Sequence, residues 1–157
     1  MTMAITTSQT CSNWFRCADP DALAVLIRDC RTDGENLMVR QSDGRYMLCC
    51  SGQILGCLTE KAEKLQKRNP RWADEHAGEA YDANLFLDRL QKCVAPGDAC
   101  ILMTTGNTNA CITNPGNVWA FGHVITPERI KGLDLQYELL KIAQDLAGPD
   151  WSCLFGD

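Results

Sequence analysis

The sequence predicts an α+β fold, in which helices pack against an antiparallel sheet of about five or six strands. Two observations predict this class. Helical segments with recognisable start and stop residues alternate with short runs of β-branched and aromatic residues. Short Gly-containing turns also join several of these runs, as expected for hairpins. The predicted order is one helix, three strands, two helices, two or three strands and a closing helix.

Length and composition indicate a single globular domain. The chain has 157 residues and a mass of 17.4 kDa; hydrophobic residues make up 45% of it and charged residues 22%. A chain of this length buries enough apolar surface to fold without disulfides or metal ions. Residues 1–18 carry little pattern and are expected to form a loose N-terminal arm, followed by one domain over residues 19–157.

The first half of the chain predicts a helix and a hairpin. The helix starts at Asp19-Pro20-Asp21, where Asp19 is the N-cap and the proline takes the first helical position. Residues 36–41 and 45–50 predict two strands, joined by the turn Ser42-Asp43-Gly44.

The middle of the chain predicts a strand, two helices and a loop. Residues 54–58 fit either a strand or the start of a helix, and we favour the strand because Thr59 suits the N-cap of a helix that ends near Arg68. Residues 70–82 are polar and are predicted to be loop. A helix over residues 83–94 is predicted from one apolar face, which contains Ala83, Phe86, Leu87, Leu90 and Val94.

The second half predicts strands at residues 99–105 and 118–125, the latter rich in β-branched and aromatic residues. The segment between them predicts a turn at 106–109, a returning strand at 110–113 and a type II turn at 114–117. A short helical turn is expected near 126–132. A long closing helix over 133–147 is predicted from one apolar row, formed by Leu135, Leu139, Ile142 and Leu146.

The lack of a recognisable targeting signal and the negative net charge indicate where the protein is located and which classes of partner it binds. Residues 1–15 do not resemble a secretory signal, and the chain contains no run of about 20 apolar residues, so a cytoplasmic protein without membrane contact is expected. A net charge of −5 and a pI of about 5.0 argue against a nucleic-acid partner.

The ten cysteines are predicted to be mostly reduced thiols, because several lie in apolar runs and the chain is read as cytoplasmic. The alternative, a disulfide framework, is typical of small secreted proteins. Two histidines, His76 and His123, and the lack of a Cys-x-x-Cys pair predict no metal site and no cofactor. A catalytic Cys/His pair stays open as an enzymatic alternative, but no catalytic residue is assigned.

Two groups of residues are candidate partner-binding sites. Lys61, Lys64 and Arg68 share one side of the predicted helix that starts at Thr59, and Arg71 follows it; this basic stripe is either a contact for an acidic partner or a solvated face. Trp119 and Phe121 project from one face of the strand at 118–125. That strand is apolar on both faces, so one face is covered either by this chain or by a partner.

The order of elements resembles that of the class I type III secretion chaperones. In the second half, the resemblance rests on the helix at 85–93, the strand Ala99-Cys100-Ile101-Leu102, the strand at 118–125 and the Leu-rich helix opened by Gly132-Leu133-Asp134-Leu135. The helix at 19–30 and the hairpin at 36–50 fit more loosely. The chain departs from the family in its many cysteines, in the segment 59–82 and in its N-terminal arm.

The resemblance implies a homodimer that binds an extended segment of a secreted protein and keeps it soluble. It also implies that Leu85, Phe86 and Leu90 form the dimer seam. We therefore predict a non-enzymatic protein-binding module whose partner is another protein. The alternative is a small inhibitor or immunity protein, of the phage or mobile-element type, such as an anti-defence protein, that binds a folded complex; a Cys/His-dependent enzyme is the third possibility.

Overall fold

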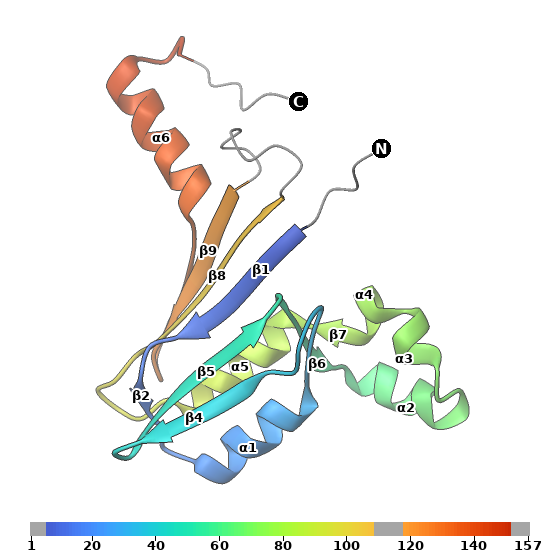
Figure 1. Cartoon of the computed structure of the whole chain (residues 1–157). Helices are drawn as coiled ribbons and strands as arrows, with labels where there is room; N and C mark the ends of the chain where they lie inside the picture. Colours follow the sequence, from blue (N-terminus) through green and yellow to red (C-terminus); the bar gives the residue numbers. More distant parts are fainter. Residues whose placement is uncertain (1–5, 109–117, 152–157) are drawn as a thin grey trace.

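The computed structural model describes residues 6–108 and 118–151 of the chain (Figure 1). Its centre is a seven-stranded sheet in the order β10-β9-β8-β1-β5, with β2 and β4 also paired to β5. All pairings are antiparallel, and the predicted α+β class is confirmed, with more strands than expected. The strands are β1 (Thr6–Ser12), β2 (Phe15–Arg16), β4 (Met38–Ser42), β5 (Arg45–Ser51), β8 (Cys100–Thr108), β9 (Val118–Ile125) and β10 (Ile130–Asp134).

A second, smaller sheet and the helices complete the described part of the chain. The small sheet has the order β3-β6-β7. Its strands are β3 (Cys30–Thr32), β6 (Ile54–Leu58) and β7 (Tyr81–Asp82). The helices are α1 (Pro20–Asp29), α2 (Glu60–Arg68), α3 (Trp72–Glu75), α4 (Ala77–Ala80), α5 (Ala83–Cys93) and α6 (Leu135–Ala147).

Local sequence signals position most of these elements. The Asp19 carboxylate accepts a hydrogen bond from the amide of Ala22 at 3.1 Å, and Thr59 Oγ1 accepts one from the amide of Ala62 at 3.1 Å, so both predicted N-caps are confirmed. Asp43 and Gly44 both have positive φ, 52° and 74°, which gives the two-residue hairpin turn between β4 and β5 the twist that its strands require.

The N-terminal segment is not a loose arm, and that prediction is wrong for the residues that the structure describes. Residues 6–12 form β1, which lies in the middle of the main sheet between β5 and β8. Thr10 and Thr104 are buried between these strands. The Thr10 hydroxyl donates to the carbonyl oxygen of Gly52 at 2.8 Å, so its own oxygen is free to accept from Thr104 at 2.8 Å. Paired hydroxyls thus let a Thr- and Ser-rich strand occupy a central position.

The hydrophobic core lies on one face of the main sheet, which we call the inner face. Helix α5 packs against β6 and β9, and α1 packs against α5 and β6 (Figure 1). An ion pair links the two helices, with Arg89 of α5 and Asp29 at the end of α1 separated by 3.1 Å. The largest completely buried side chains are Phe15, Phe86, Leu23, Leu26, Leu48, Leu90 and Ile125.

This core corrects the predicted dimer seam. Phe86 and Leu90 are buried within the chain's own core, with 1% and 0% of their surfaces exposed. Leu85 packs partly buried against the same cluster. The apolar face of α5 is therefore used inside one chain, and Phe86 and Leu90 cannot contact a second copy without opening that core.

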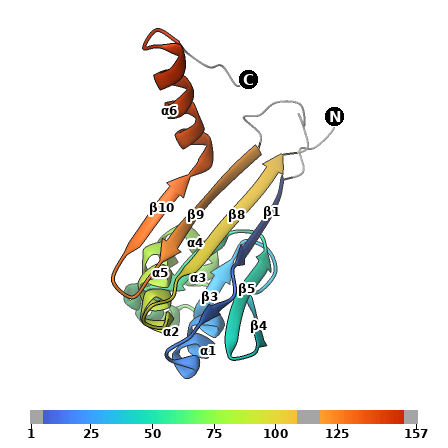
Figure 2. The same cartoon turned by 90° about the vertical axis from the view of Figure 1, so that its left-hand side faces the viewer.

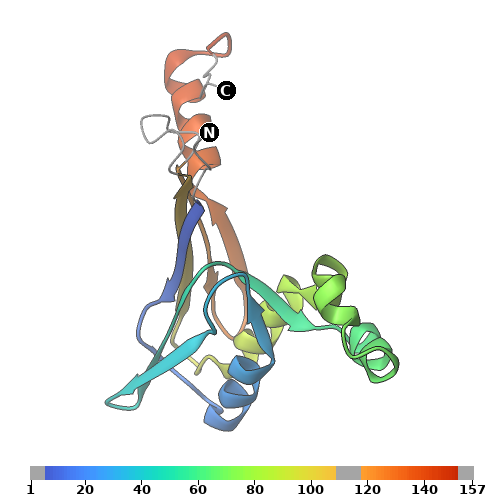
Figure 3. The same ribbon diagram turned by 45° about the vertical axis from the view of Figure 1, so that its right-hand side comes forward.

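Residues 70–82 form structure rather than a polar loop. Helices α3 and α4 follow α2, and the three form an arm that projects from the body (Figure 3). Three small buried residues, Ala62, Ala73 and Ala80, let these short helices pack closely. The arm is tied to β3 because Arg31 pairs with Asp74 and lies 5.3 Å from the centre of the Tyr81 ring. Alanine carries little hydrophobic signal, so this cluster was not visible as a pattern in the sequence.

The segment around residues 106–134 also differs from the prediction. Strand β8 continues through residues 106–108, where a turn was expected, and β10 replaces the helical turn expected near 126–132. Gly132 lies opposite His123, where there is little room for a side chain, because an added Cβ would lie 3.1 Å from the imidazole. A glycine at this position therefore allows β10 to pair closely with β9. The strand predicted at 110–113 and the turn predicted at 114–117 lie outside the described residues.

Candidate functional site

The face of the main sheet opposite the core, which we call the outer face, carries a continuous apolar row. Residues that lie directly opposite one another in register share a face of the sheet. The register of six strands places one such set side by side, and we call it the outer row: Met38, Cys49, Cys11, Met103, Gly122 and Leu133. Met38, Met103 and Leu133 are each about half exposed (52%, 48% and 48%), so the described helices leave this row open to solvent.

The outer row contains a small hollow at Gly122. Because glycine has no side chain, the surface drops between Met103 on one side and Leu133 on the other. The hollow has a volume of about 160 Å³. Apart from Lys131, the outer-face side chains that line it are apolar: Ile101, Met103, Ala120, Val124 and Leu133, with Leu135 of α6 beside them. The glycine is also structurally required, since a Cβ there would lie 2.5 Å from the carbonyl oxygen of Leu102.

Helix α6 extends the apolar surface beyond the sheet. It begins directly after β10, where the Asp134 carboxylate caps it by accepting from the amide of Tyr137 at 3.1 Å, and it projects past the ends of β8 and β9 (Figures 1 and 2). The predicted closing helix is confirmed from Leu135 to Ala147, whereas Leu133 and Asp134, expected in the helix, belong to β10. None of its residues is buried, and Leu146 is 85% exposed.

Trp119 and Phe121, predicted to bind a partner, lie on the inner face with Ile125. The Trp119 ring packs over Gly106, the residue opposite it on β8. Its indole N–H is buried and has no hydrogen-bond partner among the described residues. Trp119 also lines an open cleft of about 800 Å³ between the ends of β1, β8 and β9 and the loops that contain Asp33 and Gly52. The two aromatic residues are thus half-covered by their own chain.

The basic stripe lies on α2, far from the outer row. Lys61, Lys64 and Arg68 are exposed along one side of the helix, and Arg71 follows before α3. Lys64 is paired with Glu60 of the same helix at 3.3 Å, which reduces the local positive charge. The structure therefore brings the three helical residues together, as predicted, but does not join them to Trp119 and Phe121.

Burial makes six of the eight described thiols weaker nucleophiles than an exposed cysteine. Burial raises the pKa of Cys30 to about 12, of Cys93 to about 11 and of Cys100 to about 12. Burial also raises the pKa values of Cys17, Cys50 and Cys57. A reactive cysteine needs the opposite shift, because the thiolate is the nucleophile.

The two histidines are engaged in local packing. His76 stacks on Trp72 with ring centres 4.8 Å apart, and its Nδ1 lies 2.9 Å from the Trp72 carbonyl oxygen. Burial lowers the pKa of His123. Across residues 6–108 and 118–151, no group of three or more His, Cys, Asp or Glu side chains is arranged to hold a metal ion. No helix in those ranges has the length and apolar character to cross a membrane.

Sequence reasoning missed the outer row. Its members come from six separate strands, and each strand contributes a single residue. The only local signal is the alternation in β8, where Ile101 and Met103 are exposed while Cys100 and Leu102 are buried.

Comparison with known proteins gives no relative from which a role can be transferred. No protein-family model matches the sequence. No curated protein and no solved structure matches it either.

Proposed function

We propose that this chain is a non-enzymatic, cytoplasmic protein-binding module that holds an extended segment of a partner protein. The outer row is the observation that carries the proposal. It is an apolar band across six strands, continued by the exposed residues of α6. Exposed apolar surfaces that are contiguous in this way mark interaction sites in soluble proteins.

Two features favour an extended segment as the occupant. In the described part of the chain β10 pairs with β9 alone, so its other edge offers free main-chain donors and acceptors to an added strand. The hollow at Gly122 lies immediately beside β10 and has room for one apolar side chain. A segment along β10 would therefore gain main-chain hydrogen bonds from the edge and an apolar contact from the hollow.

Binding rather than catalysis is favoured by the chemistry of the described residues. Six thiols have raised pKa values, and the candidate surface is built from Met, Cys, Ile, Val and Leu side chains. Met, Ile, Val and Leu side chains bury apolar surface and carry no group that transfers protons. Methionine side chains are also flexible, which suits a surface that accepts varied sequences.

The proposal is tested by placing a charge in the outer row. The Met103→Lys variant and the wild-type chain are titrated, in reducing buffer, against a fluorescently labelled unfolded protein such as reduced, carboxymethylated lactalbumin. Binding by Met103→Lys is expected to be weaker by about tenfold or more, because a lysine in the contact would lose hydration or prevent burial. Since Met103 is 48% exposed, the variant should keep wild-type stability within about 0.5 kcal/mol.

Val25→Lys is the matched control. Val25 lies on α1 and is 38% exposed, so the control adds the same charge on a surface away from the outer row. It should bind the unfolded protein like the wild type. Equal binding by Met103→Lys and wild type, or equal loss in both variants, would refute the proposal.

A second copy of the chain is the competing occupant, and the solution mass identifies it. Light scattering after size exclusion is measured for the wild type and for Met103→Lys. A wild-type dimer that Met103→Lys dissociates would show that the outer row is a dimer interface, and would overturn the proposal. A monomer, or a dimer that the variant leaves intact while binding is lost, supports it.

A further inference from the structure

Six of the eight described cysteines lie in pairs. Cys11 of β1 is directly opposite Cys49 of β5, and Cys30 of β3 is directly opposite Cys57 of β6. In both cases the two residues belong to strands that are distant in sequence and are brought together by the register alone.

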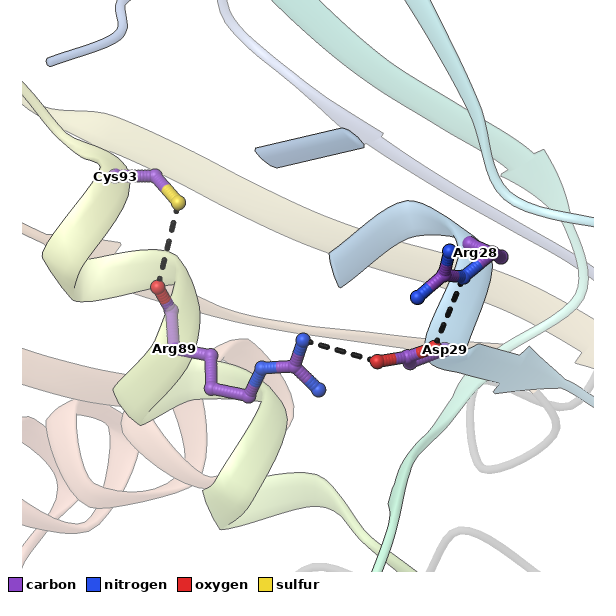
Figure 4. A network of polar contacts seen from close by, with 4 residues as sticks. All are labelled: Arg28, Asp29, Arg89 and Cys93. Atoms are coloured by element: carbon purple, nitrogen blue, oxygen red, sulfur yellow. Dashed lines mark hydrogen bonds and ion pairs between the residues drawn. The ribbon is translucent and has the colours of Figure 1, made fainter. Parts of the chain in front are cut away.

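The third pair lies where β2 meets the end of α5. Cys17 forms a bridge with Val94, and the amide of Ala18 donates to the carbonyl oxygen of Cys93 at 2.8 Å. The Cys17 and Cys93 thiols are close enough for each to influence the pKa of the other. Cys93 also donates to the Arg89 carbonyl oxygen at 3.5 Å (Figure 4).

The backbone geometry of the two strand pairs suits a disulfide. Opposite residues of antiparallel strands have Cα atoms about 4.5–5.5 Å apart and side chains on the same face. Disulfides bridge Cα atoms about 4.4–6.8 Å apart. Each pair therefore needs only small side-chain adjustments to close, with the strands already in place.

We propose that the chain has three specific sites of disulfide formation, with the connectivity Cys11–Cys49, Cys17–Cys93 and Cys30–Cys57. The oxidant is a low-molecular-mass disulfide of the glutathione class. At each site one thiolate attacks the small disulfide, forming a mixed disulfide and releasing one small thiol. The second cysteine then attacks the mixed disulfide and releases the second small thiol. Two protons and two electrons leave each cysteine pair and convert the oxidant into two thiols.

The three sites differ in accessibility, so they close in a defined order. Cys11 is exposed and Cys49 is half-buried in the outer row, and this pair meets the oxidant directly. In each of the other pairs one member is half-buried, Cys17 or Cys30, and its partner is buried. Burial raises the pKa values of these four thiols, although the nearby Arg89 guanidinium partly offsets the effect at Cys30, Cys57 and Cys93. The Cys11–Cys49 bond is therefore expected first.

The two remaining described cysteines provide an internal control. Cys50 and Cys100 are buried, and neither has a cysteine opposite it in the described strands. Cys50 lies near Cys30 and is adjacent to Cys49, so it is the natural competitor for both. Oxidation without site preference would also form disulfides with Cys50, whereas the proposed connectivity leaves Cys50 as a free thiol.

The experiment is a disulfide map of the wild-type chain. The protein is equilibrated in a glutathione redox buffer, free thiols are alkylated, and peptides are analysed by mass spectrometry without reduction. Trypsin alone leaves Cys49, Cys50 and Cys57 in one peptide, residues 46–61, so chymotrypsin is added to cleave after Leu55. Fragmentation of the peptide then separates Cys49 from Cys50.

Three cross-linked peptide pairs are expected, each short of two hydrogens relative to its reduced peptides, with Cys50 and Cys100 alkylated. Detection of Cys30–Cys50 or Cys49–Cys50 would overturn the proposed connectivity. Full alkylation of all eight described cysteines after equilibration would overturn the proposal altogether.

The Cys49→Ser variant tests one pair against the others. Cys11 should become alkylated, while Cys17–Cys93 and Cys30–Cys57 persist. Loss of all three bonds in a variant with a wild-type circular dichroism spectrum would contradict three independent sites. The disulfide map involves no binding partner. A map without the three disulfides would therefore leave the proposed binding function unaffected, and a failure of the binding experiment would leave the disulfide proposal unaffected.

Discussion

At the scale of single residues, Gly56 is a position that only glycine can occupy. It lies in β6 with φ of +128°, and an added Cβ would collide with the backbone of Asp82. Both the backbone conformation and the space therefore exclude a side chain. We expect Gly56→Ala to lower the free energy of unfolding by about 2–4 kcal/mol in urea denaturation.

Gly78→Ala is the control for the same substitution. Gly78 lies in α4, its φ is not positive, and a Cβ there would meet no atom within 4 Å. Alanine should be neutral or stabilise the chain by up to about 1 kcal/mol, since it has the higher helix propensity. If both variants lost a comparable amount of stability, the close approach of Gly56 to the Asp82 backbone could not be the cause of the loss.

The partial burial of the His123 ring leads to a prediction of how the stability of the fold depends on pH. Burial of its ring lowers its pKa below the ordinary value of 6.5, so the unfolded chain binds this proton more readily than the folded one. The resulting contribution to stability is complete above 6.5 and is lost as the pH falls through the folded pKa. Removing the imidazole should therefore flatten the acid side of the stability profile.

The measurement compares wild type with His123→Gln by urea denaturation at about pH 7.5 and about pH 5. The wild type should lose more stability than the variant on acidification. An identical loss in the two proteins would assign the acid sensitivity to other groups.

At the scale of elements, α6 should be the least stable helix. It has 13 residues and none of them is buried, and isolated helices shorter than about 12–15 residues are marginal in water. We expect its amides to exchange with deuterium roughly tenfold faster, or more, than those of α5, whose Phe86 and Leu90 anchor the core. Equal protection of α5 and α6 in the free protein would contradict this expectation.

The elements themselves were largely predictable from local signals. The N-caps Asp19 and Thr59 located two helices, and the Asp43-Gly44 turn located the hairpin. The segment 70–82 and β10 were not predictable in the same way. Their structure depends on close packing of alanines and on pairing of β10 with β9, and neither leaves a periodic pattern in the sequence.

At the scale of the whole molecule, the prediction of an α+β fold is confirmed, but the order of the strands in the sheet could not be predicted from the sequence. Nothing in residues 6–12 specifies that they lie between β5 and β8, because pairing partners distant in sequence leave no local trace. The outer row and the Cys11–Cys49 pair exist only through this position of β1, and the Cys30–Cys57 pair depends in the same way on the pairing of β3 with β6. The candidate site is therefore a property of the assembled sheet, and sequence reasoning instead selected Trp119 and Phe121, which lie on the opposite face.

The central position of β1 also affects how the chain is made. The Thr7 hydroxyl donates to the side-chain oxygen of Asn107, 100 residues further along the chain, and β1 contacts β8 along its whole length. A ribosome therefore releases the first strand long before its neighbour β8 has been synthesised. Until then the edge of β1 that faces β8 remains unpaired, and the sheet can close only late, which makes folding slow and exposes the nascent chain to aggregation.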